Sequence, residues 1–217
     1  GPAALRLVLT LAPVRESVVV TATRDAVPGS QVGATTTVID SAEIARRGVR
    51  LVSDLLRDVP GLTVVQSGGP GGVTSVFARA GESSYNKVLL DGIPLNEPGG
   101  TFNFSGLTTD FVERVEVVRG AQSALFGSDA MASVVQVVSA RARGGLSHPS
   151  VIASGEAGSY NSRRAAASIG AAQGNWDAAI HVGRQYTENR VLNSTNDGTT
   201  LGINGGIRPS DNVSLRI

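Results

Sequence analysis

The feature that most constrains the fold is a strict two-residue alternation of side chains after Gly145. A period of two residues is that of a β-strand, whose successive side chains point to opposite faces. In the clearest segment the apolar face carries Trp176, Ala178, Ile180, Val182 and Tyr186, and the polar face carries Asp177, His181, Gln185 and Thr187. Alternating segments of about ten residues are typical of strands in a transmembrane barrel.

Four further segments repeat the alternation, which gives about five strands in all. They are residues 151–158, 165–172, 201–208 and 213–217. The connections at residues 173–175 and 209–212 are tight, whereas residues 188–197 form a long polar stretch. Short turns at one end and long loops at the other match an outer-membrane barrel.

A soluble antiparallel sandwich is the alternative, because its strands alternate in the same way. Arg184 on the apolar face fits the sandwich unless it lies at a membrane interface, whereas Trp176 and Tyr186 at opposite ends of one strand favour a membrane band between aromatic girdles. We therefore expect Trp176, Ala178, Ile180 and Val182 toward lipid, and Asp177, His181 and Gln185 toward the lumen. Open strand edges are too costly in lipid, so more strands are expected to follow in the intact protein.

The first half mixes short helix and strand patterns, which indicates an α+β domain. Asp40 or Ser41 can cap a helix that ends at Gly48, and residues 53–59 make a second helix before Pro60. Asp91-Gly92 is expected to turn a hairpin. Strand-like stretches lie at residues 62–66, 73–79, 87–90, 114–118 and 134–139.

Composition excludes several classes of protein. The 19 Lys and Arg nearly balance the 18 Asp and Glu, so no field attracts nucleic acid. The chain has no cysteine and no apolar run long enough for a membrane helix. Leu5, Leu7, Leu9 and Leu11 alternate as one strand, and we expect that the chain is a fragment cut at both ends.

Four internal stretches, preceded by a Val-rich segment, occur in order. They are Asp54-Leu-Leu-Arg-Asp-Val-Pro-Gly-Leu62, Lys87-Val-Leu-Leu-Asp-Gly-Ile-Pro-Leu-Asn96, Val115-Glu-Val-Val-Arg-Gly120 and Gln122-Ser-Ala-Leu-Phe-Gly-Ser-Asp-Ala130. The series resembles the plug domain of TonB-dependent outer-membrane transporters, in the order and spacing of that family. The resemblance implies an α+β plug domain, with a small mixed sheet and short helices, followed by the first antiparallel strands of a transmembrane β-barrel.

The Val-rich segment resembles the TonB box, which the family uses to contact its energising partner in the periplasm. Its residues are Glu16, Ser17, Val18, Val19, Val20, Thr21 and Ala22. β-Branched residues favour an extended backbone, which can add as a strand to the edge of a partner's sheet. The alternative is an ordinary buried strand.

Two arginines and one loop are further candidate sites. Arg79 and Arg119 match the positions at which the family places arginines that pair with glutamates of the barrel wall, and the partner acids are expected beyond Ile217. A solvent-facing arginine at a strand end is the alternative. Loop residues that we expect to face ligand are Gly68, Gly69, Gly71, Gly72, Asn96 and Glu97.

The chain departs from the family pattern at two places. Ala80 replaces a glycine after Arg79, and Ala132-Ser133 replaces a glycine pair. These replacements predict backbone angles that do not require positive φ.

No enzyme chemistry is expected, and neither is a cofactor or a metal site. His148 and His181 are the only histidines, and neither stands in a ligand or catalytic pattern. The glycine run at residues 68–72 lacks both the Lys-Ser/Thr ending of a phosphate loop and dinucleotide spacing.

We expect residues 1–15 to end an upstream segment, 16–24 to hold the TonB box and linker, 25–143 to form the plug and 144–217 to begin the barrel. The resemblance implies active uptake of a ferric siderophore, cobalamin or similar ligand across the outer membrane. Its partners would be a TonB-like coupling protein, outer-membrane lipid and a small molecule such as a metal chelate, without nucleic acid. The plug and N-terminus would be reached from the periplasm. A ligand-gated signalling receptor and a soluble β-rich binding module are the alternatives.

Overall fold

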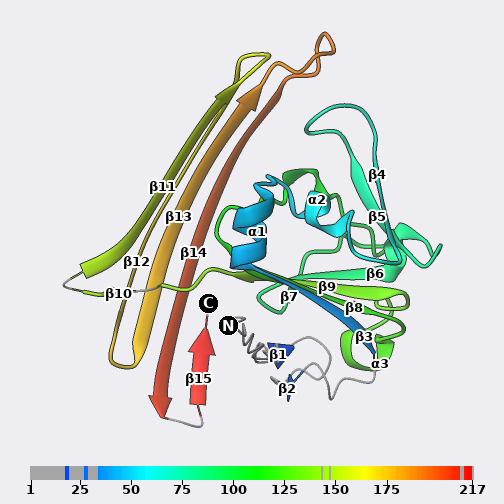
Figure 1. Ribbon diagram of the computed structural model, residues 1–217. Coiled ribbons are helices and arrows are strands. Elements are labelled where there is room, and N and C mark those ends of the chain that lie inside the picture. The colour runs from blue at the N-terminus through cyan, green and yellow to red at the C-terminus, as the bar shows by residue number, and fades with distance from the viewer. Residues whose placement is uncertain are drawn as a thin grey trace, which may run out of the picture.

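The computed structural model describes residues 18–19, 27–28, 34–142, 144–146, 148–210 and 213–216. Residues 34–142 form an α+β domain, which lies beside a tall antiparallel sheet, here called the wall sheet (Figure 1). The chain therefore combines the mixed α+β domain and the antiparallel strands that the sequence predicts.

The α+β domain is built on a five-stranded sheet. Its strands, in spatial order, are β3 (Thr35–Asp40), β8 (Val112–Arg119), β9 (Ser133–Ser139), β6 (Asn86–Leu90) and β7 (Ile93–Pro94). β6 and β9 pair in parallel, and the other neighbours pair antiparallel. A separate hairpin joins β4 (Leu62–Gln66) to β5 (Thr74–Ala78).

Short helices close the domain. α1 (Ser41–Arg47) starts as predicted, because the Asp40 side chain accepts from the Glu43 backbone N–H, and it ends at Gly48 with φ 61°. α2 (Val52–Leu56) starts one residue before the predicted range and ends three residues before its end. The remaining helices are η2 (Ser83–Tyr85), η3 (Phe104–Gly106) and α3 (Ser123–Phe126). None of the helices in the described ranges is long and apolar enough to cross a membrane.

The hydrophobic core lies between α1, α2 and one face of the five-stranded sheet. Val52, Leu55 and Leu56 are fully buried there against β8 and β9. A smaller cluster around Val118 and Val134 packs under α3 on the opposite face. Burial on both faces explains the nearly continuous valine runs of these two strands.

Two turns show how local sequence sets the backbone. Asp91 and Gly92 both have positive φ, and they connect β6 to β7 in the predicted hairpin. The expectation for Ala80 is wrong, because Arg79 and Ala80 both have positive φ (49° and 59°). The turn needs this conformation because the Gly81 N–H donates to the Ala78 carbonyl, 2.8 Å away.

The wall sheet is a meander in which each strand pairs antiparallel with the next. Its strands are β10 (Gly144–Gly145), β11 (His148–Gly158), β12 (Ser162–Gln173), β13 (Trp176–Thr187), β14 (Asn196–Ser210) and β15 (Val213–Arg216). The four central strands run longer than predicted, because pairing continues into residues that do not alternate clearly. Within the described residues the sheet is open and does not close into a barrel.

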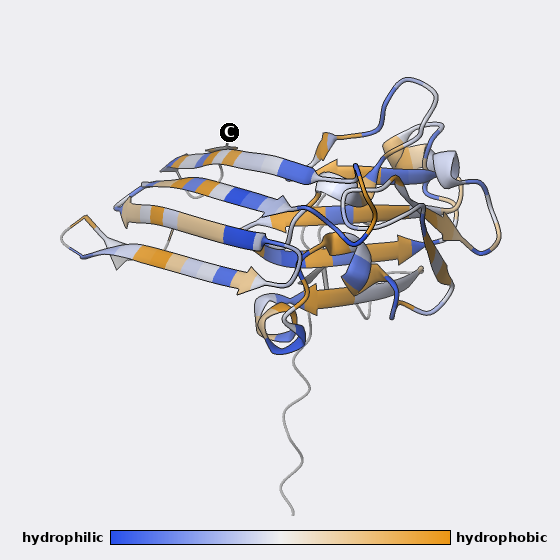
Figure 2. Cartoon of the chain, turned by 90° about the horizontal axis from the view of Figure 1, so that it is seen from above, coloured by the Kyte–Doolittle hydropathy of each residue, from blue (hydrophilic) through white to orange (hydrophobic). Residues whose placement is uncertain are grey.

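The predicted alternation is confirmed in β13. The Ile180 side chain is 51% exposed, whereas its neighbours Ala179 and His181 are 4% and 5% exposed. Across the strands, Val151, Ile169, Ile180 and Ile203 follow one another in register as exposed apolar residues. Figure 2 shows the strands of the wall sheet standing side by side next to the α+β domain. One face of the sheet therefore packs on the domain and the other stays apolar and uncovered.

Upstream of the domain, β1 (Val18–Val19) pairs antiparallel with β2 (Val27–Pro28). The strand expected at residues 5–11 lies outside the described residues.

Candidate functional site: the cavity between the two sheets

The inward face of the wall sheet contacts the α+β domain through few, specific side chains. Phe111, just before β8, stacks on His181 of β13 with ring centroids 4.5 Å apart. At the end of β9, the Ser139 hydroxyl accepts from the Asn204 side-chain amide of β14 at 2.6 Å. Two-residue periodicity places His181 and Asn204 on this face.

Four charged residues form a network across the interface. Arg164 of β12 donates through Nε and Nη2 to the two carboxylate oxygens of Asp110, and through Nη1 to Glu156 of β11 at 3.1 Å. Glu156 also pairs with Arg50 of the α+β domain at 2.5 Å. Arg164 and Asp110 are largely buried, with side chains 11% and 13% exposed. Such a bidentate contact is among the stronger charge-assisted hydrogen bonds, and it fixes the domain against the sheet.

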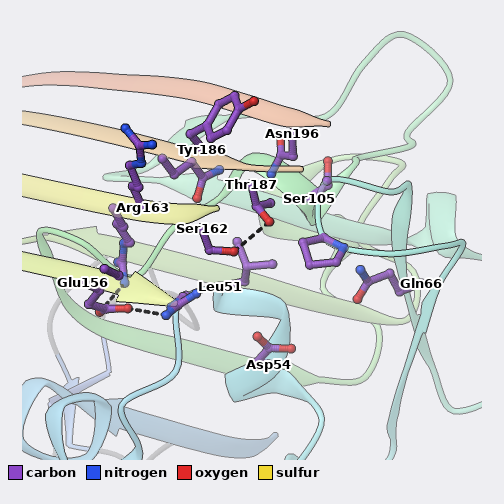
Figure 3. Close-up of a pocket in the computed structure, with 16 residues that line it drawn as sticks. Leu51, Asp54, Gln66, Ser105, Glu156, Ser162, Arg163, Tyr186, Thr187 and Asn196 are labelled. Carbon is purple, nitrogen blue, oxygen red and sulfur yellow. Dashed lines mark hydrogen bonds and ion pairs between the residues drawn. The ribbon is translucent and has the colours of Figure 1, made fainter. Parts of the chain in front are cut away.

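Above this network lies a cavity of about 210 Å³, here called the outer cavity. Figure 3 shows its lining from both sides: Leu51, Asp54, Gln66 and Ser105 from the α+β domain, and Glu156, Ser162, Arg163, Tyr186, Thr187 and Asn196 from the wall sheet. The wall residues sit where β11 to β14 end at the connections 159–161 and 188–195. The cavity therefore opens toward the end of the wall that carries the long polar loop, with both charge signs in its lining.

The glycine-rich segment connects β4 to β5 and touches this loop. The Pro70 carbonyl accepts from the side chain of buried Asn189 at 2.9 Å. A Cβ on Gly71 would lie 2.7 Å from Cγ of Asn196, and Gly71 has φ +88°. Only glycine allows this approach, so the predicted loop reaches the outer cavity at Gly71.

Two of the predicted loop residues, Asn96 and Glu97, lie elsewhere. The Asn96 side chain forms hydrogen bonds within the α+β domain. Its Oδ1 accepts from the Val88 N–H, and its Nδ2 donates to the carbonyls of Asn86 and Gly100. Exposed Glu97 forms the turn to Gly100 through its backbone. These contacts brace the loop that follows β7.

Arg79 and Arg119 lie close together. Both side chains come within 4.0 Å of the position that a Cβ on Gly61 would occupy. Arg119 is buried and donates to the Thr37 hydroxyl and the Pro60 carbonyl, while Arg79 is exposed. The described bonds of Arg119 therefore stay within the α+β domain.

Only Val18 and Val19 of the predicted TonB box are described, as β1. Glu16, Ser17, Val20, Thr21 and Ala22 lie outside the described residues.

Sequence reasoning missed the charged network. Arg50, Asp110, Glu156 and Arg164 stand in four separate segments, and no motif connects them. The two-residue alternation was the available signal, because it places Glu156 and Arg164 on the polar face. They lie opposite each other in the β11–β12 register. In the described part of the chain, no cluster of three or more His, Asp or Glu side chains could hold a metal ion.

Comparison with known proteins agrees with this architecture. Residues 28–134 match the family model described as TonB-dependent Receptor Plug Domain. This stretch of the chain is thus similar to the plug domain of TonB-dependent receptors.

Among individual relatives, the vitamin B12 transporter BtuB of Vibrio vulnificus is 42% identical over 123 residues, which cover 57% of this chain and 20% of the relative. The ferripyoverdine receptor of the outer membrane of Pseudomonas aeruginosa has a similar fold, with TM-score 0.75 and 19% identity over 92% of this chain and 26% of the receptor. The siderophore receptor PiuA of Acinetobacter baumannii gives TM-score 0.66 and 22% identity over 83% of this chain and 25% of that receptor. The chain thus spans about a fifth to a quarter of the length of these proteins, and the soluble sandwich is not favoured.

Proposed function

We propose that this chain is the plug and the first wall strands of a receptor that takes up a scarce ligand across the outer membrane. The observation that carries the proposal is the two-sided wall sheet. Its inward face holds the plug through the pairs Asp110–Arg164 and Phe111–His181, and its outward face is a band of exposed isoleucine, leucine and valine. A barrel wall around a plug requires this distribution, because lipid excludes charge and a wet lumen accepts it.

The ligand would be a bulky hydrophilic molecule, and cobalamin is our first candidate. The 42% identity with a vitamin B12 transporter supports this choice, while the solved structures with a similar fold include siderophore receptors. The outer cavity would form part of the binding site, since Arg163, Gln185 and Thr187 offer donors there. Gly71 would bring the plug's hairpin next to the bound molecule.

The segment Glu16 to Ala22 would bind a TonB-like periplasmic protein by strand addition. Among the described residues, Val18 and Val19 pair with Pro28 and Val27. An extended segment of this kind can pair instead with the edge of a partner's sheet. The short turn at residues 174–175 would face the periplasm, and the loop at 188–195 the outside.

Arg79 and Arg119 would complete the docking of the plug by pairing with acids of further wall strands. Exposed Arg79 is the better placed, because Arg119 already binds Thr37 and Pro60. A guanidinium inside a barrel requires an acid or water as its partner.

Uptake by cells that express the complete receptor as their sole transporter of this kind tests the function. We expect energy-dependent uptake of radiolabelled cyanocobalamin, lost when residues 16–22 are deleted while surface binding remains. Uptake of a ferric siderophore in place of cyanocobalamin would correct the proposed ligand, and the proposal of an outer-membrane uptake receptor would stand. Binding and uptake of neither molecule would contradict the proposal.

A further inference from the structure

A second cavity lies directly below the outer cavity, between the same two surfaces. This inner cavity has a volume of about 260 Å³. Strands β11, β12 and β13 line both cavities, the outer one near one end and the inner one further along: for example Glu156 and Ser154 on β11, Arg164 and Ala166 on β12, Gln185 and His181 on β13. The two cavities are therefore neighbours along the inward face of one sheet.

The Asp110–Arg164 pair stands between them. Arg164 lines the outer cavity and Asp110 lines the inner one, so their bidentate contact spans the boundary. Arg164 has a second acid available, since Glu156 already accepts from its Nη1. The guanidinium can leave Asp110 and remain paired, which makes this contact suited to opening.

The wall side of the inner cavity is lined mostly by small neutral side chains. Ser150, Ser154, Ala166, Ser168, Gly170 and Ala179 leave space along the wall. His181 also lines it, and neither ring nitrogen has a hydrogen-bond partner among the described residues, although the side chain is buried. Buried polar atoms are nearly always satisfied, so these nitrogens are available to a polar group that enters the cavity.

We propose that a ligand passes first through the outer and then through the inner cavity, along β11, β12 and β13, and that the Asp110–Arg164 pair is the barrier between them. The inference rests on the proposed uptake function and specifies where a hydrophilic ligand passes the plug. Separation of the pair joins the cavities, and the hydroxyls and His181 then solvate the ligand in transit.

Thiol accessibility tests the barrier without any ligand. Residues 1–217 contain no cysteine. In a Ser168→Cys variant of the complete receptor, the single thiol in this stretch therefore lies at the inner cavity. Cells are treated from outside with a hydrophilic maleimide. We expect Asp110→Asn, added to Ser168→Cys, to raise the labelling rate about tenfold, because a broken charge pair no longer holds the boundary. Ser139→Ala, which removes the contact to Asn204, is the matched control and should leave the rate unchanged. Equal rates with Asp110→Asn and with Ser139→Ala would overturn the inference.

Cross-linking tests the barrier during uptake. A reversible bifunctional thiol reagent joins Asp110→Cys to Arg164→Cys in one receptor, and Ser139→Cys to Asn204→Cys in another. Binding of cyanocobalamin should survive in both, while uptake should stop only with the first link and return on reduction. Continued uptake through the first link, or a block by both, would contradict this route. Failure of the unmodified receptor to bind cyanocobalamin would count against the proposed ligand, and the labelling result would still decide the barrier.

Discussion

Phe111 of the plug stacks on His181 of β13, with ring centroids 4.5 Å apart and ring planes 24° from parallel. Phe111 holds this position with φ +66°, an uncommon conformation for an aromatic residue. Its carbonyl accepts from the Ala140 N–H, which ties the strained residue to the strand that leads toward the wall. The stack therefore joins the plug's main sheet to the wall sheet at the point where the chain passes between them.

Phe111→Ala should weaken plug docking by about 2 kcal/mol, because it removes the ring and leaves a gap beside the inner cavity. The measurement is hydrogen exchange of plug amides in the complete receptor as urea is raised. Phe102→Ala is the control, since Phe102 packs on Phe104 within the plug. The Phe102→Ala variant should lower plug stability and leave the contacts between the plug and the wall sheet in place. Equal protection of the Phe111 variant and the native receptor would refute the role of the stack.

Lysine substitutions test which face of the wall meets lipid. Ile180→Lys should cost about 2–4 kcal/mol if that residue lies near the bilayer midplane. Ser168→Lys is the matched control, because Ser168 pairs with His181 and so lies one residue from Ile180 in depth, on the inward face beside a cavity. It should cost less than about 1 kcal/mol. Folding stability in bilayers measures both, and equal penalties would reverse the assignment of the faces.

The hairpin of the plug offers a paired test of its contact with the wall loop. Gly68 and Gly71 have similar positive φ, +84° and +88°, but only Gly71 lies against Asn196. Alanine at either position costs about 1 kcal/mol in backbone strain. Gly71→Ala should in addition push the loop away and lower ligand affinity about tenfold, or about 1.4 kcal/mol. Equilibrium binding to the complete receptor measures this, and equal affinities for the two variants would separate the hairpin from the binding site.

The two arginines should differ in effect. Arg119→Ala leaves the Pro60 carbonyl and the Thr37 hydroxyl without their donor, and should lower plug stability by about 1–3 kcal/mol. Arg79→Ala, at an exposed site, should change it by less than about 0.5 kcal/mol and act on docking alone. Chemical unfolding and plug exchange rates separate the two effects. Docking unchanged in the double variant would remove both residues from the plug–wall contact.

Sequence reasoning succeeded where the signal is local or periodic. The Asp40 cap and Gly48 stop define α1, and alternation from Trp176 to Tyr186 assigns the faces of β13. It did not predict β3, because three threonines at its start dilute the apolar pattern. The strain at Ala80 was hidden because the four-residue turn from Ala78 to Gly81 sets its angle, not the residue itself. The Asp110–Arg164 pair joins residues 54 positions apart, and only the packing of one sheet on another brings them together.

The backbone of the predicted TonB box provides the last test. Val19 lies in β1 and pairs with Val27 of β2, so its backbone is already extended as strand addition requires. Val19→Pro removes a backbone donor and should block strand addition to a TonB-like protein. Val19→Thr keeps both the N–H and the β-branch and is the matched control. In cells with the complete receptor, we expect the proline variant to bind cyanocobalamin at the surface and to lose uptake, while the threonine variant does both. Loss of surface binding by the proline variant would show that this segment supports the fold and would refute its assignment as the coupling segment.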